Sequence, residues 1–269
     1  MTGIAFSWEG SGFGNALILA HLTKIVNDNG IHARFVPHKK THNMAVNHKL
    51  VDVPVYDPEI HKDYFLHTKQ FPAHFHLKSC DLPILQQYMK DVEKIFEQTL
   101  IFDREKHNHV PVIFKDPGPH EKVDVVLCTH SSPWSPYRDW PYFAQLKEMF
   151  YNEGITYIDL NQHGIMSFLC LSYVKHCKLY VGLETGTSHY VSHFANGKAL
   201  IIQGGFSPFY YWAWPYDYDF VSADVSCEYR PCFIDKKFMK RGFPCKHNVA
   251  CMTAIRPEQV FEEVRRRIQ

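Results

Sequence analysis

Residues 177–205 read CKLYVGLETGTSHYVSHFANGKALIIQGG, and this stretch decides the fold. Its pattern predicts an apolar strand at 179–182, a polar loop at 183–187, a short helix at 188–195 and a second strand at 199–202. A strand, a helix and a second strand in this order form a parallel pair, because parallel strands need a crossover connection. The polar loop is then expected at the carboxyl edge of a parallel sheet.

The loop after the first strand is made of small residues. Thr185, Gly186 and Thr187 would present backbone N–H groups at the point where the strand ends and the helix begins. A helix N-terminus reached through such a loop is a ready site for a phosphate group. We interpret it as a cradle for a diphosphate. The alternative is an ordinary strand-to-helix corner without a ligand, since the fuller glycine fingerprints are missing.

Strands and helices alternate outward from this stretch. In the second half we predict strands at 123–128 and 155–160 and helices at 140–152, 165–174 and 257–268. In the first half we predict a strand–helix–strand unit over 3–36, a strand at 51–56, a long loop at 58–79 and a helix at 82–100. Such alternation is typical of parallel sheets covered by helices, so we expect an α/β fold.

A proline-rich segment separates the two halves. Residues 107–121, HNHVPVIFKDPGPHE, are the predicted linker between two domains. We therefore expect an N-terminal domain at 1–115 and a C-terminal domain at 116–269, with a cleft between them.

The composition is that of a globular protein. Of 269 residues, 45% are hydrophobic and 21% charged, which excludes the disordered and membrane classes. The net charge of +1 gives no global attraction to nucleic acid. The first residues, MTGIAFSWEGSG, lack the basic start and apolar core of a signal peptide, so we expect a cytoplasmic protein.

Four of the eight cysteines crowd into residues 227–251 with the spacing C-x4-C-x12-C-x5-C. They are Cys227, Cys232, Cys245 and Cys251. Disulfides are not expected in a reducing compartment, and four thiolates at such spacing suit a tetrahedral structural metal. The alternative is four cysteines without a metal.

Three short motifs resemble those of a known family. Glu184-Thr185-Gly186-Thr187-Ser188-His189 stands where that family has Asp-Thr-Gly-Pro-x-His, and Arg138-Asp139-Trp140-Pro141 matches its basic-x-Trp-Pro signature. In the first half, Gly12-Phe13-Gly14-Asn15 stands in place of Gly-x-Gly-Asp. From about residue 124 to its end the chain resembles the sugar-donor domain of glycosyltransferase family nine. The likeness is greatest to the autotransporter heptosyltransferases, which carry a four-cysteine iron site.

The resemblance implies a GT-B architecture, in which two Rossmann-like domains face a cleft. It implies a glycosyltransferase of the hexosyl, heptosyl or pentosyl class that takes a nucleotide-diphosphate sugar in the second domain and an acceptor in the first. Helix-terminal N–H groups and the cation of Arg138 would absorb the charge of the departing diphosphate, so no catalytic metal is expected. The substrate-binding residues that it implies are Gly12, Gly14, Arg138, Trp140, Glu184, Thr185, Gly186, Thr187, Ser188 and His189.

The catalytic base is where this chain departs from the family. An inverting displacement needs a group that takes the proton of the acceptor hydroxyl, and the family uses an acidic residue of the first domain. Asn15 occupies the heptosyltransferase Asp position, and an amide is not a general base. Glu9 lies in the same turn and is our substitute, with a solvated glutamate of no catalytic role as the alternative.

Several partners follow from the resemblance alone. The acceptor could be a protein hydroxyl, a lipopolysaccharide sugar or a hydroxylated DNA base. The metal of the four-cysteine segment would be iron, although zinc fits the same ligands. A chain that kept the fold and lost the base would instead be a non-catalytic module that binds a nucleotide sugar or a glycan.

Overall fold

The structure is a computed structural model that describes residues 3–7, 13–36, 54–55, 57, 59–60, 62–63, 65–67, 82–108, 116, 118, 121–131, 136–163, 168–195, 197–208, 211, 213–215, 217–234 and 245–269. Its internal contacts divide the chain into two compact units. The first unit is Met1–Lys115 with Tyr210–Pro215, and the second is Asp116–Phe209 with Tyr216–Gln269. The first unit therefore includes a short segment, Tyr210–Pro215, that the sequence prediction assigned to the second domain.

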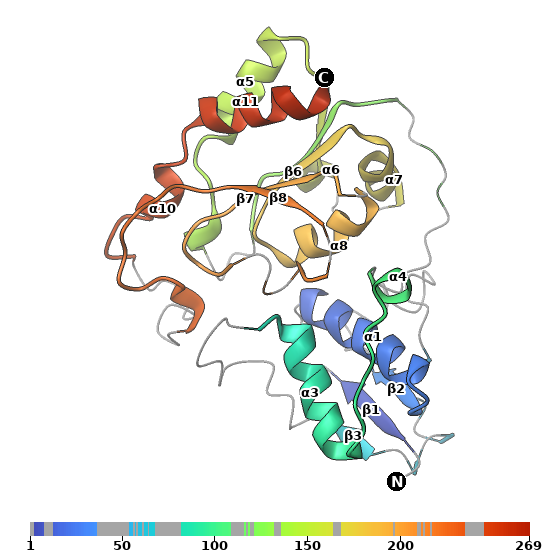
Figure 1. Ribbon diagram of the computed structural model, residues 1–269. Helices are drawn as coiled ribbons and strands as arrows, with labels where there is room; N and C mark the ends of the chain where they lie inside the picture. The colour runs from blue at the N-terminus through green and yellow to red at the C-terminus, as the bar shows by residue number, and fades with distance from the viewer. Residues whose placement is uncertain are drawn as a thin grey trace. The chain divides into compact units, whose positions relative to one another are not determined.

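The second unit is built on a five-stranded parallel sheet (Figure 1). In spatial order its strands are β5 (Tyr157–Asp159), β4 (Val125–Cys128), β6 (Leu179–Leu183), β7 (Ala199–Ile202) and β8 (Asp219–Val221). Helices accompany this sheet, so the predicted α/β class is confirmed. β8, whose three residues are too short to show a period, was not predicted.

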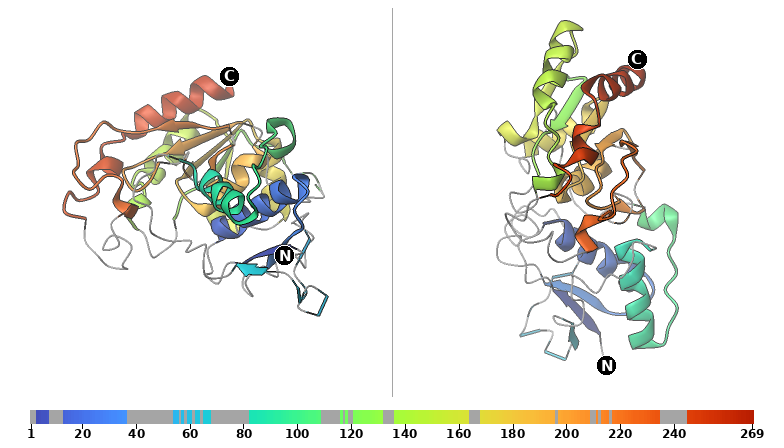
Figure 2. Two further views of the ribbon diagram at one scale, coloured as in Figure 1. Left: turned by 60° about the horizontal axis from the view of Figure 1, so that its bottom comes forward. Right: turned by 90° about the vertical axis from the view of Figure 1, so that its left-hand side faces the viewer.

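The central strands are buried on both faces, which explains why they read as unbroken apolar runs. Alternate residues such as Val181 and Leu183 join the core formed with α5 (Phe143–Asn152) and α11 (Pro257–Ile268). These two helices lie side by side (Figures 1 and 2). Figure 1 shows α7 (Phe168–His176) and α8 (Gly186–Phe194) on the other side of the sheet.

The first unit has a smaller parallel sheet in the order β2-β1-β3. β1 (Ile4–Ser7) lies between β2 (Ala33–Val36) and β3 (Phe65–His67), and α1 (Phe13–Asp28) packs on β1, on β2 and on α3 (Ile84–Phe96). The predicted strand–helix–strand unit over 3–36 is confirmed. Residues on the inner side of α1, such as Leu22 and Val26, are fully buried.

Two predictions for the first half are wrong. β3 lies inside 58–79, which the sequence predicted as a loop, because three residues are too few for a period to be recognised. The linker was predicted to begin at His107, but that residue is buried and ends the helix α4 (Arg104–His107). Asp103 starts α4, because its Oδ1 accepts the backbone N–H groups of Glu105 and Lys106 at 2.9 and 3.3 Å.

Other predicted boundaries shift for local reasons. α3 ends at Phe96 rather than at 100, because Glu97 turns left-handed at φ 50°. α7 is described from Phe168, and its predicted start at residue 165 lies outside the described residues; a separate turn, α6 (Leu160–His163), directly follows β5. Of the predicted strand at 51–56, Pro54 and Val55 are described, and Val55 forms a single bridge with Phe35. Among the described residues, no helix combines the length and the apolar content that crossing a membrane requires.

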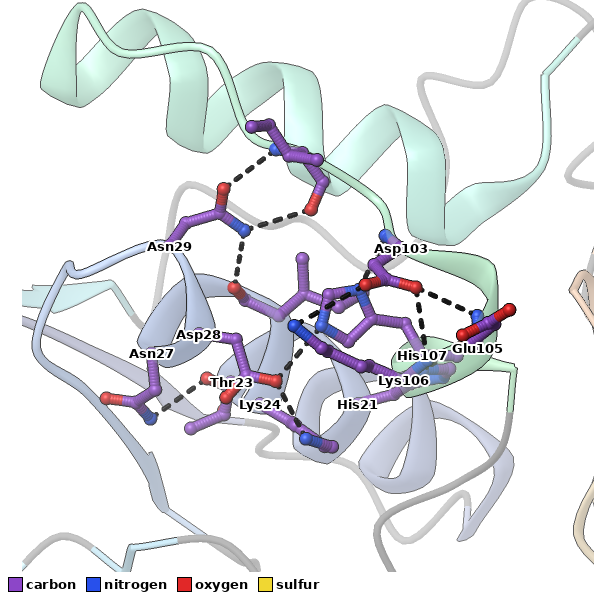
Figure 3. Close-up of polar contacts among 12 residues, drawn as sticks. His21, Thr23, Lys24, Asn27, Asp28, Asn29, Asp103, Glu105, Lys106 and His107 are labelled. Atoms are coloured by element: carbon purple, nitrogen blue, oxygen red, sulfur yellow. Dashed lines mark hydrogen bonds and ion pairs between the residues drawn. The ribbon is translucent and has the colours of Figure 1, made fainter.

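A buried histidine joins α1 to α4 within the first unit (Figure 3). Nδ1 of His107 accepts the N–H of Asp103 at 3.0 Å, so Nε2 carries the proton and donates to Oδ2 of Asp28 at 3.0 Å. The carbonyl of His107 accepts Nε2–H of His21 at 2.8 Å. Asp28 is also held by Lys24, whose Nζ lies 2.7 Å from Oδ2. Three hydrogen bonds thus converge on one side chain and its carbonyl.

Replacement of His107 by alanine should destabilise the first unit by about 2–3 kcal/mol, because it leaves the Asp103 N–H without its acceptor and opens a cavity. The free energy of unfolding from denaturant titration measures the loss. Lys106→Ala is the matched control, since Lys106 is exposed and should change stability by less than about 0.5 kcal/mol. Equal stabilities of the two variants would contradict the role of His107.

Candidate functional site

The strand order of the second unit marks one place on its sheet. From β4 the chain moves outward to β5 and then returns to β6 on the other side of β4, so the order reverses between β4 and β6. In open α/β sheets, ligands bind outside the carboxyl ends of the strands at such a switch point. β4 ends at Cys128 and β6 at Leu183, so the residues that follow these two strands form the candidate site.

The loop after β6 is shorter than the sequence predicted. α8 already begins at Gly186, so Glu184 and Thr185 alone join strand to helix. Oγ1 of Thr185 accepts the N–H of Ser188 at 3.2 Å, which caps the first turn. The N–H groups at the start of a helix have no acceptor within the helix. Gly186 and Thr187 therefore contribute backbone donors at this edge, as the phosphate interpretation requires.

Ser188 fixes α8 against β6. Its hydroxyl is buried and lies 2.7 Å from the hydroxyl of Tyr180 and 3.3 Å from Oγ1 of Thr185. Gly182 makes this close approach possible. A Cβ added there would overlap the hydroxyl of Tyr180, lie 2.7 Å from Cζ of the same ring and lie 2.9 Å from Oγ of Ser188.

Gly182→Ala should therefore destabilise the second unit by about 1–3 kcal/mol, the usual effect of overpacking. Thermal unfolding would report it as a lower melting temperature. Tyr180→Phe removes the hydroxyl, the closest of the overlapping atoms, although Cζ stays, so the double variant Gly182→Ala/Tyr180→Phe should lose less stability than the sum of the single variants. Additive losses would show that the hydroxyl is not the obstacle.

Arg138 is the central side chain of the site. It ends the turn η2 (Pro136–Arg138) and is only 7% exposed. Its Nη1 donates to the backbone carbonyl of Glu184 at 2.9 Å and lies 3.6 Å from Oε2 of the same residue. The guanidinium also lies over the ring of Phe206, 5.0 Å from its centroid. Arg138 thus holds the loop in place, and its charge is balanced inside the protein.

Glu184 and His189 complete this buried cluster. Oε1 of Glu184 lies 3.6 Å from Nε2 of His189, and both residues are almost fully buried. Burial lowers the pKa of His189, although the neighbouring carboxylate of Glu184 pulls it upward. His189 is therefore neutral at pH 7, and Arg138 is the cation that compensates Glu184.

Trp140 was predicted to contact substrate, but the structure places it in the core. Its Nε1–H donates to the carbonyl of Ile255 at 2.8 Å, and its ring packs edge-on against Phe143 at 5.0 Å. Because its single donor is used there, Trp140 supports the site as a framework residue.

A second polar loop follows β4, and sequence reasoning missed it. Thr129, His130 and Ser131 come directly after the buried strand. Their backbone is held by Asn161, which follows β5, and by Asp139, which follows Arg138. The available signal was a run of polar residues at the end of an apolar strand, the same signal that identified Glu184 and Thr185.

The predicted acceptor-side residues are described only in part. Glu9 and Gly12 lie outside the described residues. Gly14 and Asn15 lie in the first turn of α1. Oδ1 of Asn15 is buried and accepts no hydrogen bond from any residue that the structure describes. As a neutral amide, Asn15 has no basic group for proton removal.

The four cysteines of the predicted metal segment lie near one another in the second unit. Burial raises the pKa of Cys232 to about 12, and the neighbouring thiols of Cys251, Cys227 and Cys245 act in the same direction. Sγ of Cys245 accepts the N–H of Val249 at 3.4 Å.

A second set of possible metal ligands lies in the same segment and shares Cys227 with the four thiols. Among the described residues, the thiol of Cys227, the carboxylate of Glu228 and the imidazole of His247 lie within 4.8 Å of one another. Glu228 Oε2 and His247 Nε2 are 3.0 Å apart. Cys227 therefore belongs to two candidate ligand sets, the predicted four thiols and this mixed group. Both sets suit zinc, and the thiols also suit iron.

Comparison with solved structures identifies the fold family that this chain resembles. No protein-family model matches the sequence, and no curated protein matches it. Among solved structures, the bacterial iron-containing dodecameric glycosyltransferase TibC from enterotoxigenic E. coli is similar, with a TM-score of 0.61 at 10% identity over 99% of this chain and 76% of that one. E. coli ADP-heptose lps heptosyltransferase II gives a TM-score of 0.56 at 10% identity, covering 98% of each chain. A family 9 glycosyltransferase from Veillonella parvula gives 0.56 at 12% identity, covering 98% of this chain and 96% of that one.

TibC has also been solved with ADP-D-beta-D-heptose. The chain has the fold of the family-nine heptosyltransferases, as the resemblance predicted.

Proposed function

We propose that this chain, which has the heptosyltransferase fold, is a glycosyltransferase that uses a nucleotide-diphosphate sugar. The observation that supports this most is the short loop at the switch point, where α8 begins directly over a buried Arg138–Glu184 pair. Helix N-terminal N–H groups bind phosphate oxygens, and the cluster beneath them fixes the loop before the ligand arrives. A GT-B arrangement, in which two Rossmann-like domains face a cleft, is part of the proposal.

The reaction is an inverting displacement. The oxygen of an acceptor hydroxyl forms a bond to the anomeric carbon, the bond from that carbon to the phosphate oxygen breaks, and the nucleoside diphosphate leaves with the electron pair. The N–H groups of Gly186 and Thr187 stabilise the negative charge that grows on the leaving group, so the step needs no catalytic metal. The hydroxyl proton passes to a base, for which Glu9 remains our candidate.

A screen of nucleotide sugars tests the proposal. ADP-heptose, UDP-glucose and other nucleotide sugars are added singly, and the rise in melting temperature and the release of nucleoside diphosphate are both measured. A donor should raise the melting temperature and be hydrolysed slowly even without an acceptor. Absence of any shift and any hydrolysis across the screen would refute the function.

The acceptor class is proposed as macromolecular: a protein, a glycan such as lipopolysaccharide, or a hydroxylated base in DNA. The neutral amide at Asn15 favours a second candidate, a non-catalytic module that binds a nucleotide sugar or glycan. The screen separates the two, because the module would show a thermal shift without release of nucleoside diphosphate. For DNA, binding should weaken steeply with salt, whereas the other acceptors predict a flat response.

A structural metal in residues 227–251 also belongs to the proposal, and TibC, which is iron-containing, supports it. We expect protein produced without added metal to carry about one equivalent of iron or zinc. Cys227→Ser should abolish binding, because Cys227 belongs to both candidate ligand sets. Loss of the metal in Cys251→Ser but not in His247→Ala would indicate four thiolates, and the reverse would indicate the mixed group. Less than about a tenth of an equivalent in the unaltered protein would contradict the metal.

A further inference from the structure

We propose that Phe206 is a positioning residue of the donor site, whose ring fixes Arg138 against the loop before α8 and ties that loop to residues 227–251, the cysteine segment. The proposal rests on the proposed function and adds to it a residue that follows β7 rather than β6. It is carried by observations within the second unit: the contacts of the ring with Arg138 and with Phe233, the hydrogen bonds of the neighbouring backbone, and the close packing of two glycines.

Phe206 lies at the same edge of the sheet as the donor loop. It follows Ile202, the last residue of β7, and β7 pairs in parallel with β6, so the two strands end at one edge. The N–H of Gln203 donates to the carbonyl of Val221 at 2.9 Å, which continues the pairing with β8 past the end of β7. Phe206 is only 5% exposed, and its ring therefore belongs to the interior of the site.

One contact of the ring is with the cation of the site. The guanidinium of Arg138 lies over the ring, 5.0 Å from its centroid. Because the face of an aromatic ring carries negative charge density, it attracts the cation and favours one placement of the planar guanidinium. In that placement Nη1 donates to the carbonyl of Glu184 at 2.9 Å, just before α8 begins at Gly186. The ring thus acts on the loop through Arg138.

A second set of contacts joins Phe206 to the cysteine segment. The turn η3 (Cys232–Ile234) presents two successive N–H groups to the chain after β7. That of Cys232 donates to the carbonyl of Gly205, and that of Phe233 donates to the carbonyl of Phe206, each at 3.1 Å. The ring of Phe233 is buried, and its centroid lies 6.2 Å from that of Phe206. η3 therefore holds both the backbone and the ring of Phe206.

Two glycines bring the chain after β7 into close contact with the cysteine segment. A Cβ added at Gly205 would lie 2.7 Å from both Cδ and Nε of Arg230. One added at Gly204 would overlap Sδ of Met252 and lie 3.3 Å from Sγ of Cys251. Because close-packed groups do not move independently, a displacement of the cysteine segment is passed on to Phe206. The order of this segment therefore contributes to the order of the donor loop.

This support is distinct from a contact with the donor. N–H groups at the start of α8 bind phosphate oxygens best when they are in place before the ligand arrives. A loop that must become ordered on binding lowers the affinity, because its ordering costs free energy. The side chain of Phe206 has no hydrogen-bond donor to offer a phosphate, so its effect on affinity runs through Arg138 and the loop.

The test uses the full-length protein and measures the loop itself as well as nucleotide binding. Phe206→Leu keeps an apolar side chain and removes the ring, and Phe233→Leu does the same on the side of the cysteine segment. Phe261→Leu in α11 is the matched control, because Phe261 is also 5% exposed but packs on Phe150. Hydrogen exchange reports the order of residues 184–188, and calorimetry with ADP and with UDP reports nucleotide affinity.

We expect Phe206→Leu to speed amide exchange in residues 184–188 about fivefold and to weaken the better-bound nucleoside diphosphate by a similar factor. Phe233→Leu should have the same effects at a smaller size. Phe261→Leu should leave both quantities within about twofold, even where it lowers the melting temperature. In the Arg138→Met/Glu184→Gln background, which lacks the guanidinium, Phe206→Leu should not speed loop exchange further.

Equal loop exchange in Phe206→Leu and Phe261→Leu would overturn the positioning role, and so would an undiminished effect of Phe206→Leu in the background without the guanidinium. Unchanged loop exchange in Phe233→Leu would overturn the link to the cysteine segment. If the unaltered protein bound neither nucleotide and hydrolysed no donor, the proposed function would fall, while the exchange measurements would still decide whether Phe206 positions the loop.

Discussion

Replacement of Arg138 by alanine is expected to lower the free energy of unfolding by about 3–5 kcal/mol, because it leaves the buried carboxylate of Glu184 without its cation. It also removes the hydrogen bond to the Glu184 carbonyl and the packing on Phe206. Denaturant titration at pH 7 measures the effect. Nucleotide affinity should fall in parallel, since the loop at the start of α8 loses its support.

A matched variant separates charge from packing. In Arg138→Met/Glu184→Gln both charges are gone while the side chains keep similar volumes. Replacement of a buried ion pair by neutral groups is often close to neutral in stability, so this double variant should be more stable than Arg138→Ala. A loss below about 1 kcal/mol for Arg138→Ala would show that the pair is not a stabilising element.

Replacement of Glu9 by glutamine is expected to reduce sugar transfer by about 100-fold or more, the usual contribution of a general base. Affinity for the nucleotide donor should not change, because the amide keeps the size and polarity of the carboxylate. The measurement is transfer to an acceptor beside donor binding by calorimetry. Near-normal turnover in this variant would contradict Glu9 as the base.

A second variant, at Asn15, tests the same proton transfer from the opposite direction, by adding an acid instead of removing one. Asn15→Asp restores an acid at the position where the heptosyltransferases have one. If it rescues transfer in the Glu9→Gln background, the two positions serve the same proton. If it has no effect there, the base function belongs to Glu9 alone or to neither.

The sequence predicted the elements that carry strong periodic or apolar signals. β6, β7 and α11 were found where the structure has them, because a buried parallel strand reads as an apolar run and an amphipathic helix as a regular stripe. β3 and β8 were missed, since three residues leave no period to recognise. Their pairing is decided by the neighbouring strand, which is not visible locally.

In the candidate site, too, local features were predicted from the sequence and long-range contacts were not. The loop from Glu184 to Ser188 follows from a strand, small residues and a helix in succession, all local features. Arg138 and Glu184 were both identified as site residues, but their pairing was not predicted, because the hydrogen bond between them joins residues 46 apart. The same motif pointed to Trp140 as a substrate-binding residue, and the structure places its indole in the core, where it donates to the carbonyl of Ile255, 115 residues away in the sequence. Whether a polar residue faces a ligand or the core is decided by tertiary contacts.

The return of Tyr210–Pro215 to the first unit has a consequence for synthesis on the ribosome. Trp214 packs on Phe102 with ring centroids 4.6 Å apart, and Tyr211 is fully buried. A domain made only from residues 1–115 could mature as soon as it left the exit tunnel, since chains grow and fold from the N-terminus. Here the nascent first unit must wait until residue 215 has emerged, when most of the second unit is already present. The first unit therefore completes its fold only after most of the second unit has been synthesised.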